Sequence, residues 1–275
     1  MKDFLNADSL IRSTEAVIRN PLKAPRTGKL KVGIDLGTSY TVLVVLDEKG
    51  NPLACKMEYA EVIKDGLVVD FIGCSEIVKR LKAEAERSIG REVLNAAIAV
   101  PPTTSTADAS THRYVVESAG IVVTDIFNEP TAANAVLSIS DGAIVDIGGG
   151  TTGISVFKAG KVVYVNDEAT GGNHMTLVIA GNKKISFESA EKYKKDTANR
   201  EKVFPIVVPV IEKMATIVDR HIRNFDIDLL CLVGGTACIC GIESMMEQMT
   251  GVHTVKPENP LLVTPLGIAM MMNAN

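Results

Sequence analysis

Apolar and polar positions follow two different periods along this chain of 275 residues, and the changes of period mark the expected elements. Short apolar runs that end at an acid, a glycine or a proline predict strands, among them KVGIDLG, TVLVVLD, AAIAVPP, GAIVDIG and LLCLVGG. Apolar residues three or four positions apart predict helices at 73–91, 105–120, 131–140, 171–181, 185–195, 204–222, 241–251 and 263–273, the sixth beginning near Pro205 or Pro209. Strands and helices that alternate in this way are typical of an α/β fold.

The first 29 residues differ from the body. A helical stripe within MKDFLNADSLIRSTEAVIRN carries Phe4, Ala7, Ile11, Thr14 and Ile18. Asn20-Pro21 ends this helix, and a linker with proline and glycine follows. Two interpretations are open: a helix that docks on the body, and an amphipathic tag that binds the surface of a partner.

Composition and charge narrow the possible functions. The net charge of −4, the 4% of aromatic residues and the absence of tryptophan give no sign of a nucleic-acid-binding face or a basic membrane face. No apolar run approaches about 18 residues, so we expect no membrane span. Five cysteines without a metal-binding spacing fit a reducing cytosol, so we expect a cytoplasmic protein without a zinc site.

One phrase occurs twice in the chain, as VGIDLGTSYTVLVV and as AIVDIGGGTTGISVF. Each copy has an apolar strand, an acid (Asp35 or Asp146), a glycine-rich turn with hydroxyls, and a second strand, so each predicts a β-hairpin. Such a turn lets backbone N–H groups converge on a phosphate, and a carboxylate at its base is a ligand that suits Mg²⁺. The repeat therefore predicts two related lobes that close on one polyphosphate.

The order of the motifs resembles the actin/Hsp70/sugar-kinase ATPase superfamily. Its five signature segments have counterparts here in order: VGIDLGTSYTVLVV, NEPTAANAV, IVDIGGGTTGISVF, LVGGTACICGIE and PLLVTPLGIAM. The resemblance implies a two-lobed actin-like ATPase fold with ribonuclease H-like lobes and reduced peripheral subdomains. We expect the helix and linker at 1–29, lobe I at 30–137 with 259–275 returning to it, and lobe II at 138–258.

The same resemblance implies a site for ATP or ADP with Mg²⁺. Asp35 and Asp146 are expected to face the metal ion through water. Glu129 is expected to orient the attacking water, and the expected catalytic residues are these two acids and Glu129. Taken singly, the first two could be ordinary turn acids and Glu129 a helix-start acid, but their order favours the site. The expected nucleotide-binding residues all lie in turns: Gly37, Thr38, Ser39, Gly148, Gly149, Gly150, Thr151, Thr152, Gly171, Gly172, Gly234, Gly235 and Thr236.

Several positions depart from the pattern of the superfamily. Cys238 stands where the heat-shock chaperones stack an arginine on adenine, and Gly153 and Leu261 stand where acids are expected. No lysine matches the catalytic lysine of the chaperones, and 183–203 is too short for the subdomain that clasps adenine in large members. We therefore expect phosphate recognition to be intact, adenine recognition to be weakened, and hydrolysis to be slow at most.

The short length and the phrase DEATGGNHMTLVIAGNKKISFESAEKYK resemble a chaperone-like member of the gene set for ethanolamine utilization, which builds a bacterial microcompartment. This resemblance implies a chaperone or assembly factor whose partners are ethanolamine-utilization enzymes or microcompartment shell proteins, located in the cytoplasm or with the microcompartment. Neither nucleic acid nor a membrane is an expected partner. A scaffold that binds nucleotide without turnover, a small-molecule kinase and an actin-like filament protein remain as alternatives.

Overall fold

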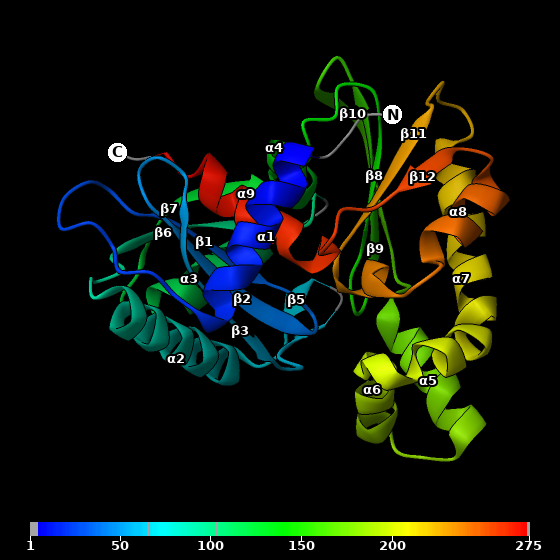
Figure 1. Ribbon diagram of the computed structural model, residues 1–275, viewed down its shortest axis with the longest axis horizontal. Coiled ribbons are helices and arrows are strands. Elements are labelled where there is room, and N and C mark those ends of the chain that lie inside the picture. The colour runs from blue at the N-terminus through cyan, green and yellow to red at the C-terminus, as the bar shows by residue number, and fades with distance from the viewer. Residues whose placement is uncertain (1–4, 65, 103, 274–275) are drawn as a thin grey trace. The chain divides into compact units, whose positions relative to one another are not determined.

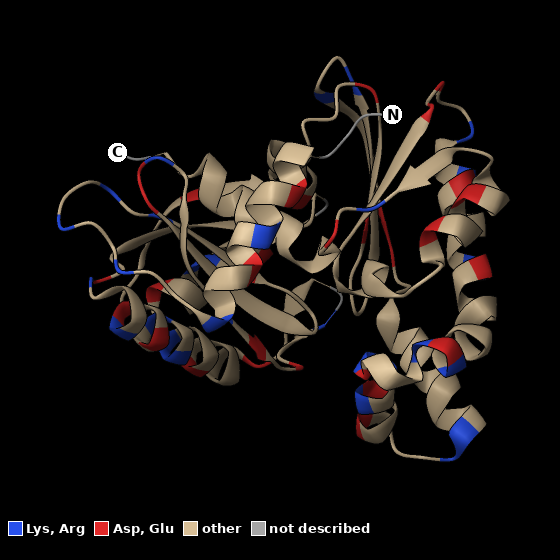
Figure 2. Cartoon of the chain, in the orientation of Figure 1, with Lys and Arg blue, Asp and Glu red and all other residues tan. Residues whose placement is uncertain are grey.

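The computed structural model describes residues 5–64, 66–102 and 104–273, and it divides into two compact units. Unit 1 comprises 1–138 and 257–275, and unit 2 comprises 139–256 (Figure 1). Within the described residues, no helix is both long and apolar enough to cross a membrane. Acidic and basic residues alternate along the surface helices instead of forming one basic face, as Figure 2 shows for α2 (Phe71–Ile89) and α6 (Phe187–Lys195).

Each unit is built on a five-stranded sheet with the same topology. In unit 1 the order is β3 (Pro52–Tyr59), β2 (Tyr40–Leu46), β1 (Lys31–Leu36), β6 (Asn95–Val100), β7 (Val122–Asn128). In unit 2 it is β10 (Lys161–Glu168), β9 (Thr152–Lys158), β8 (Gly142–Ile147), β11 (Leu229–Val233), β12 (His253–Val255). In both sheets the first three strands are antiparallel and the last two run parallel to the central one. The repeated phrase thus corresponds to a repeated sheet, and the predicted α/β, actin-like fold class is confirmed.

In unit 1 the sheet packs against α2, α3 (Thr106–Glu117), α4 (Glu129–Leu137) and α9 (Val263–Met271). A short hairpin of β4 (Ile63–Lys64) and β5 (Leu67–Val68) precedes α2. The helices predicted at 131–140 and 263–273 correspond to α4 and α9, which pack closely on each other because Gly267 lies against the Ala132 carbonyl, where a Cβ would collide. Helix α3 ends at Glu117, earlier than predicted, and Gly120 follows in a left-handed turn with φ of 71°.

The N-terminal helix, α1 (Leu5–Arg19), packs on β3 of unit 1. Its buried stripe consists of Ala7, Ile11, Thr14 and Val17, so Val17 takes the place predicted for Ile18, and the predicted Phe4 lies outside the described residues. The linker is held as well, because Leu22 N donates to Leu53 O at 2.7 Å and the Arg91 guanidinium donates to Pro25 O and Gly28 O. In this structure the helix is docked on the body, as the first of the two interpretations expects.

Unit 2 carries its helices in the segment after β10 and between β11 and β12. They are α5 (Gly172–Lys183), α6, the short 3₁₀ helix η1 (Thr197–Asn199), α7 (Arg200–Ile222), the 3₁₀ helix η2 (Gly235–Cys238) and α8 (Ile242–Thr250). A further 3₁₀ helix, η3 (Pro260–Leu262), precedes α9 in unit 1.

The start predicted for α7 was wrong: the helix begins at Arg200 and contains both Pro205 and Pro209. A proline inside a helix removes one backbone hydrogen bond and usually ends the helix. Here one apolar stripe runs unbroken past both prolines and is fully buried in the core of unit 2, through Val203, Val207, Ile211, Met214 and Val218. This burial outweighs the lost hydrogen bonds, since each buried aliphatic side chain contributes about 1.5–3 kcal/mol.

Candidate nucleotide site

The two copies of the repeated phrase form matching hairpins. In β1–β2, Gly37 N donates to Tyr40 O at 3.0 Å, and in β8–β9, Gly148 N donates to Thr151 O at the same distance. The acids occupy equivalent positions on the central strands, where Asp35 pairs with Val42 and Asp146 pairs with Gly153. The sequence repeat therefore corresponds to one local geometry that is built twice.

In unit 1, three groups of predicted site residues lie at one edge of the sheet. The turn with Gly37, Thr38 and Ser39 follows β1, and Glu129 opens α4 directly after β7. Because β1, β6 and β7 are parallel, their carboxyl ends meet at the same edge. The fold thus brings Asp35, the first turn and Glu129 to the same side of unit 1.

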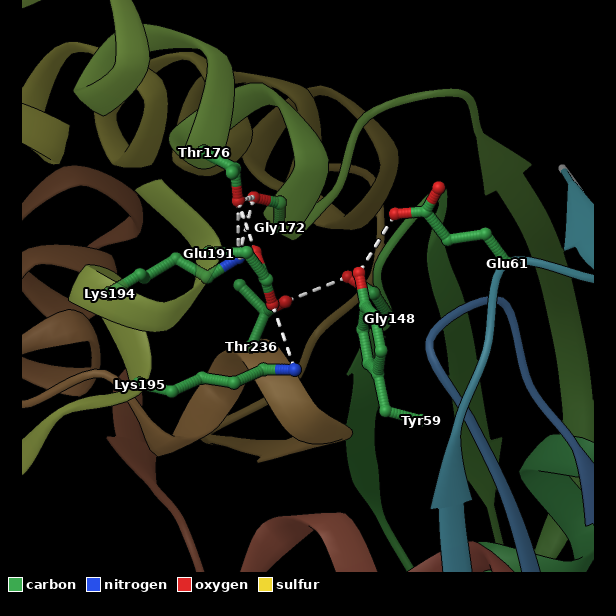
Figure 3. Close-up of polar contacts among 9 residues, drawn as sticks. All are labelled: Tyr59, Glu61, Gly148, Gly172, Thr176, Glu191, Lys194, Lys195 and Thr236. Carbon is green, nitrogen blue, oxygen red and sulfur yellow. Dashed lines mark hydrogen bonds and ion pairs between the residues drawn. The ribbon is translucent and has the colours of Figure 1, made fainter. Parts of the chain in front are cut away.

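In unit 2, the Gly148 carbonyl joins three loops that are far apart in the sequence. It accepts a hydrogen bond from Gly172 N at 3.0 Å and another from Thr236 Oγ1 at 2.8 Å, and Figure 3 shows the second of these. Asn173 N donates to the neighbouring Gly149 O at 2.8 Å. The second hairpin turn, the start of α5 and the turn after β11 are thereby held as one cluster, which we call the Gly148 hub.

Glycine is required at three positions of this hub because the backbones approach so closely. A Cβ on Gly171 would lie 2.6 Å from Gly149 O, and a Cβ on Gly172 would collide with Thr236 Oγ1. Gly234 has a positive φ of 88°, and a Cβ there would collide with the Asp146 carboxylate. These glycines therefore allow the three loops of the hub to pack in direct backbone contact.

The remaining predicted residues of unit 2 differ in how they are placed. Gly149, Gly150 and Thr151 complete the turn before β9, and Gly235 is exposed at the start of η2. The Thr152 side chain is buried and its hydroxyl donates to Thr170 O at 2.7 Å, so it anchors the neighbouring loop. The Thr236 hydroxyl is likewise engaged with the Gly148 carbonyl. Both threonines therefore support the site through the backbone of the loops.

Sequence reasoning missed a charged cluster beside the hub. Lys194 Nζ of α6 lies 2.6 Å from Glu191 Oε2 and donates to Gly172 O at 3.0 Å and to Thr176 Oγ1 at 2.7 Å. Lys195 Nζ lies 3.1 Å from the other Glu191 oxygen, and the Thr176 hydroxyl also donates to this carboxylate (Figure 3). The spacing of the acid and the two lysines on one helix face was visible in the sequence, but the contact with Gly172 depends on how α5 and α6 fold back on each other.

The burial of this cluster shifts its ionisation. Burial alone would raise the pKa of Glu191, but the two ammonium groups and the Thr176 hydroxyl together hold that pKa below the ordinary value. Burial lowers the pKa of Lys194, while Glu191 acts in the opposite direction. The side chains of Glu191 and Lys194 are only 8% and 10% exposed, so the pair is a structural link between α6 and the loop at Gly172.

The donor chemistry of the predicted site fits a hydrated magnesium ion. Asp35 and Asp146 supply carboxylate oxygens at the base of glycine-rich turns, which are the hard ligands that Mg²⁺ prefers. Among residues 5–64, 66–102 and 104–273, no group of three or more Asp, Glu, His or Cys side chains could hold an ion by itself. Mg²⁺ gives up its waters reluctantly, so each carboxylate would hold such an ion through water, together with phosphate oxygens of a ligand.

Known proteins resemble this chain both in sequence and in fold. The family model of the type IV pilus assembly protein PilM matches residues 111–262. The ethanolamine utilization protein EutJ of Escherichia coli strain K12 is 42% identical over 257 residues, which cover 93% of this chain and 91% of that protein. The crystal structure of EutJ from Carboxydothermus hydrogenoformans is 44% identical and superposes with a TM-score of 0.93 over 98% of this chain and 100% of that one. MreB5 of Spiroplasma citri bound to AMPPNP shares the fold at 16% identity, with a TM-score of 0.71 over 90% of this chain and 96% of that one.

Proposed function

Because this chain belongs to the EutJ family of ethanolamine utilization proteins, we propose that it is a nucleotide-binding, chaperone-like assembly factor for the proteins of that pathway. The observation that carries the nucleotide part is the Gly148 hub, in which one carbonyl holds the second hairpin turn, the start of α5 and the turn after β11 together. A turn preorganised in this way offers its backbone N–H groups to a phosphate without a further ordering cost. MreB5, which shares the fold, binds AMPPNP, and the proposal extends nucleotide binding to this chain.

Each group of residues has a distinct part in the proposed site. The turns at Gly37–Ser39 and Gly148–Thr151 bind phosphate oxygens of ATP or ADP, and Asp35 and Asp146 hold waters of the magnesium ion, which neutralises phosphate charge when bound. Glu129 orients a water for slow hydrolysis, since it lies at the same edge of the unit 1 sheet as the first hairpin turn.

The nucleoside is proposed to lie beside the hub. Gly172, Gly234 and Thr236 border this region, and the cluster of Glu191, Lys194 and Lys195 adds charged and hydrogen-bonding groups next to it. Cys238 is exposed at the end of η2, close to the same turn. Lys195, whose side chain is 36% exposed, is the member of this cluster proposed to meet the nucleoside, while Glu191 and Lys194 hold the loop at Gly172.

The proposed partners are ethanolamine-utilization enzymes or microcompartment shell proteins, and the proposed location is the cytoplasm or the microcompartment. Binding and release of nucleotide would alter the surface that meets such a partner, as nucleotide switches do elsewhere. Affinity capture with the full chain, in the presence of ATP and after its removal, tests this part. A set of captured pathway proteins that does not change with nucleotide would contradict a nucleotide-dependent assembly role.

Calorimetric titration of the full chain with ATP and with ADP, each with magnesium, tests the nucleotide part. We expect saturable binding with one nucleotide per chain. The absence of binding for both nucleotides would contradict the proposal.

A hydrolysis assay then separates an ATPase from a scaffold without turnover. If Glu129 orients the water, Glu129→Ala lowers the rate at least tenfold, since positioning of the nucleophile is a large part of this chemistry. Equal rates in the two proteins would support the scaffold. Sedimentation with and without ATP tests the filament alternative, which requires nucleotide-dependent pelleting.

A further inference from the structure

Three residues of unit 2 form a row across neighbouring strands beside the second hairpin turn. Gly153 on β9 pairs with Asp146 on β8 and with Asp167 on β10. Residues that pair directly across antiparallel strands present their side chains on the same face of a sheet. Asp146 and Asp167 therefore flank a position that has no side chain.

The neighbours of Asp167 confirm which face it occupies. Asn166 and Glu168 both contact His221 of α7, and Glu168 Oε1 also lies 2.7 Å from Arg220 Nη2. Successive side chains on a strand alternate between faces, so Asp167 lies on the face opposite to α7. This part of β10 is regular, since its one irregularity lies between Val162 and Tyr164.

The Asp167 carboxylate leans over Gly153. A Cβ built on Gly153 would lie 3.8 Å from Asp167 Oδ1 and 4.0 Å from Asp146 Cβ. An aspartate from β10 thus lies next to the space beside Asp146 that a side chain at 153 would enter. Gly153 is also the position where the superfamily pattern leads one to expect a second acid.

The loop after Asp167 also contains a buried hydroxyl. The Thr170 side chain is only 2% exposed, and among the described residues its hydroxyl has no hydrogen-bond partner. Buried hydroxyls are nearly always hydrogen-bonded, to protein or to ordered water.

We propose that Asp167 on β10 is the second metal-facing carboxylate of unit 2, that it acts with Asp146 two strands away on β8, and that it replaces an acid at position 153 on β9 between them. This inference rests on the proposed nucleotide function. Two strand spacings place the backbones of the two acids about 10 Å apart, and the Asp146 carboxylate lies on the side of Gly234, so the two acids would meet such an ion through its waters and not directly. Asp167 is thus a positioning residue that accepts hydrogen bonds from water on the metal, a role in which loss of one partner lowers metal affinity about 10- to 100-fold.

Four forms of the full chain test this assignment: the wild type, Asp167→Asn, Glu168→Gln and the double variant Asp167→Asn/Gly153→Asp. Glu168→Gln is the matched control, because it removes a charge from the adjacent residue on the opposite face. The double variant returns a carboxylate from β9, where the built Cβ meets only ordinary contacts. Mn²⁺ affinity is measured by electron paramagnetic resonance with and without ADP, ADP affinity is measured in EDTA, and circular dichroism confirms folding.

We expect Asp167→Asn to weaken Mn²⁺ binding in the presence of ADP about tenfold, with ADP affinity in EDTA unchanged. Glu168→Gln should behave as the wild type, and the double variant should recover most of the loss. Wild-type Mn²⁺ affinity in Asp167→Asn, equal losses in the two single variants, or a double variant as weak as the single one would each overturn the assignment.

The EDTA measurement separates this inference from the function on which it rests. If the wild type binds no ADP, the nucleotide proposal fails, and the Mn²⁺ titration without ADP still decides the role of Asp167. In that case a weaker Mn²⁺ affinity in Asp167→Asn supports the carboxylate assignment, and an unchanged affinity contradicts it.

Discussion

The pair of Glu191 and Lys194 gives the sharpest prediction about what holds the hub in place. Both side chains are nearly buried, and Lys194 Nζ reaches Glu191, Thr176 and the Gly172 carbonyl at 2.6–3.0 Å. The perturbations are Glu191→Gln, Lys194→Met and the double variant. They keep the volume of each side chain nearly constant and remove charge from one or both partners.

The structure predicts unequal losses. Removing one partner of a buried ion pair costs about 3–5 kcal/mol because the other charge is left uncompensated. In Lys194→Met, Glu191 retains Lys195 at 3.1 Å, so we expect the free energy of unfolding to fall by about 2–3 kcal/mol. In Glu191→Gln, Lys194 retains only neutral acceptors, and we expect the free energy of unfolding to fall by about 3–4 kcal/mol. The loss in the double variant should be about 2–3 kcal/mol smaller than the sum of the two single losses, since residues in contact are energetically coupled.

Hydrogen exchange of the α5 and α6 amides is the suitable assay, because a chain with two compact units need not unfold in one step. Lys192→Met, at an exposed position of α6, is the matched control and should change exchange free energies by less than about 0.5 kcal/mol. Losses below about 1 kcal/mol in both single variants, or strict additivity in the double variant, would refute the reasoning.

Three further predictions follow from burial and close packing. Ile11→Ala on α1 should lower the opening free energy of unit 1, measured by hydrogen exchange of its amides, by about 2–5 kcal/mol. Arg12→Ala, which removes an exposed ion pair with Glu258, should lower it by at most about 1 kcal/mol, and equal losses would mean that α1 is not docked in solution. Gly171→Ala should weaken ADP binding at least tenfold in calorimetry, because the new Cβ meets Gly149 O. The control Gly181→Ala, at an open position on α5, should raise the melting temperature because alanine has the higher helix propensity. Unchanged ADP affinity in Gly171→Ala would contradict the role of the hub. The pKa of Glu191 in the folded protein lies below the ordinary 4.5, so the ionised carboxylate stabilises the fold above pH 4.5, and this stabilisation is lost as the pH falls further. The melting temperature should therefore fall more between pH 7 and pH 4 in the wild type than in Glu191→Gln. Parallel declines in the two proteins would count against the shift.

The elements most faithfully predicted from the sequence are those with strong local signals. The strands of both hairpins and the turns at Gly37 and Gly148 follow from apolar runs that are interrupted by glycine and hydroxyl residues. The helix at 187–195 begins where Ser186 caps it, as its sequence indicates. In these segments the local preference and the tertiary structure agree, so the pattern alone is sufficient.

The errors arise where tertiary packing overrides local preference. Pro205 and Pro209 argue locally for a helix that starts later, but the buried stripe of α7 extends the helix through both. The contacts of Lys194 with Gly172, and of Asp167 with the space over Gly153, depend on strand register and on how helices fold back. No single-sequence pattern specifies which loop a side chain on another element will meet.

The central claim is that the glycine turns of both repeats bind the phosphates of a nucleotide. The most direct test is to label the chain with ¹⁵N-glycine and to follow the backbone amide signals by NMR as magnesium and ADP are added. We predict that the signals of Gly37, Gly148, Gly149 and Gly150 move with saturation, while Gly50 and Gly160, in open turns, stay in place. Saturable shifts that leave the four turn glycines unmoved, or no shifts at all, would contradict the account.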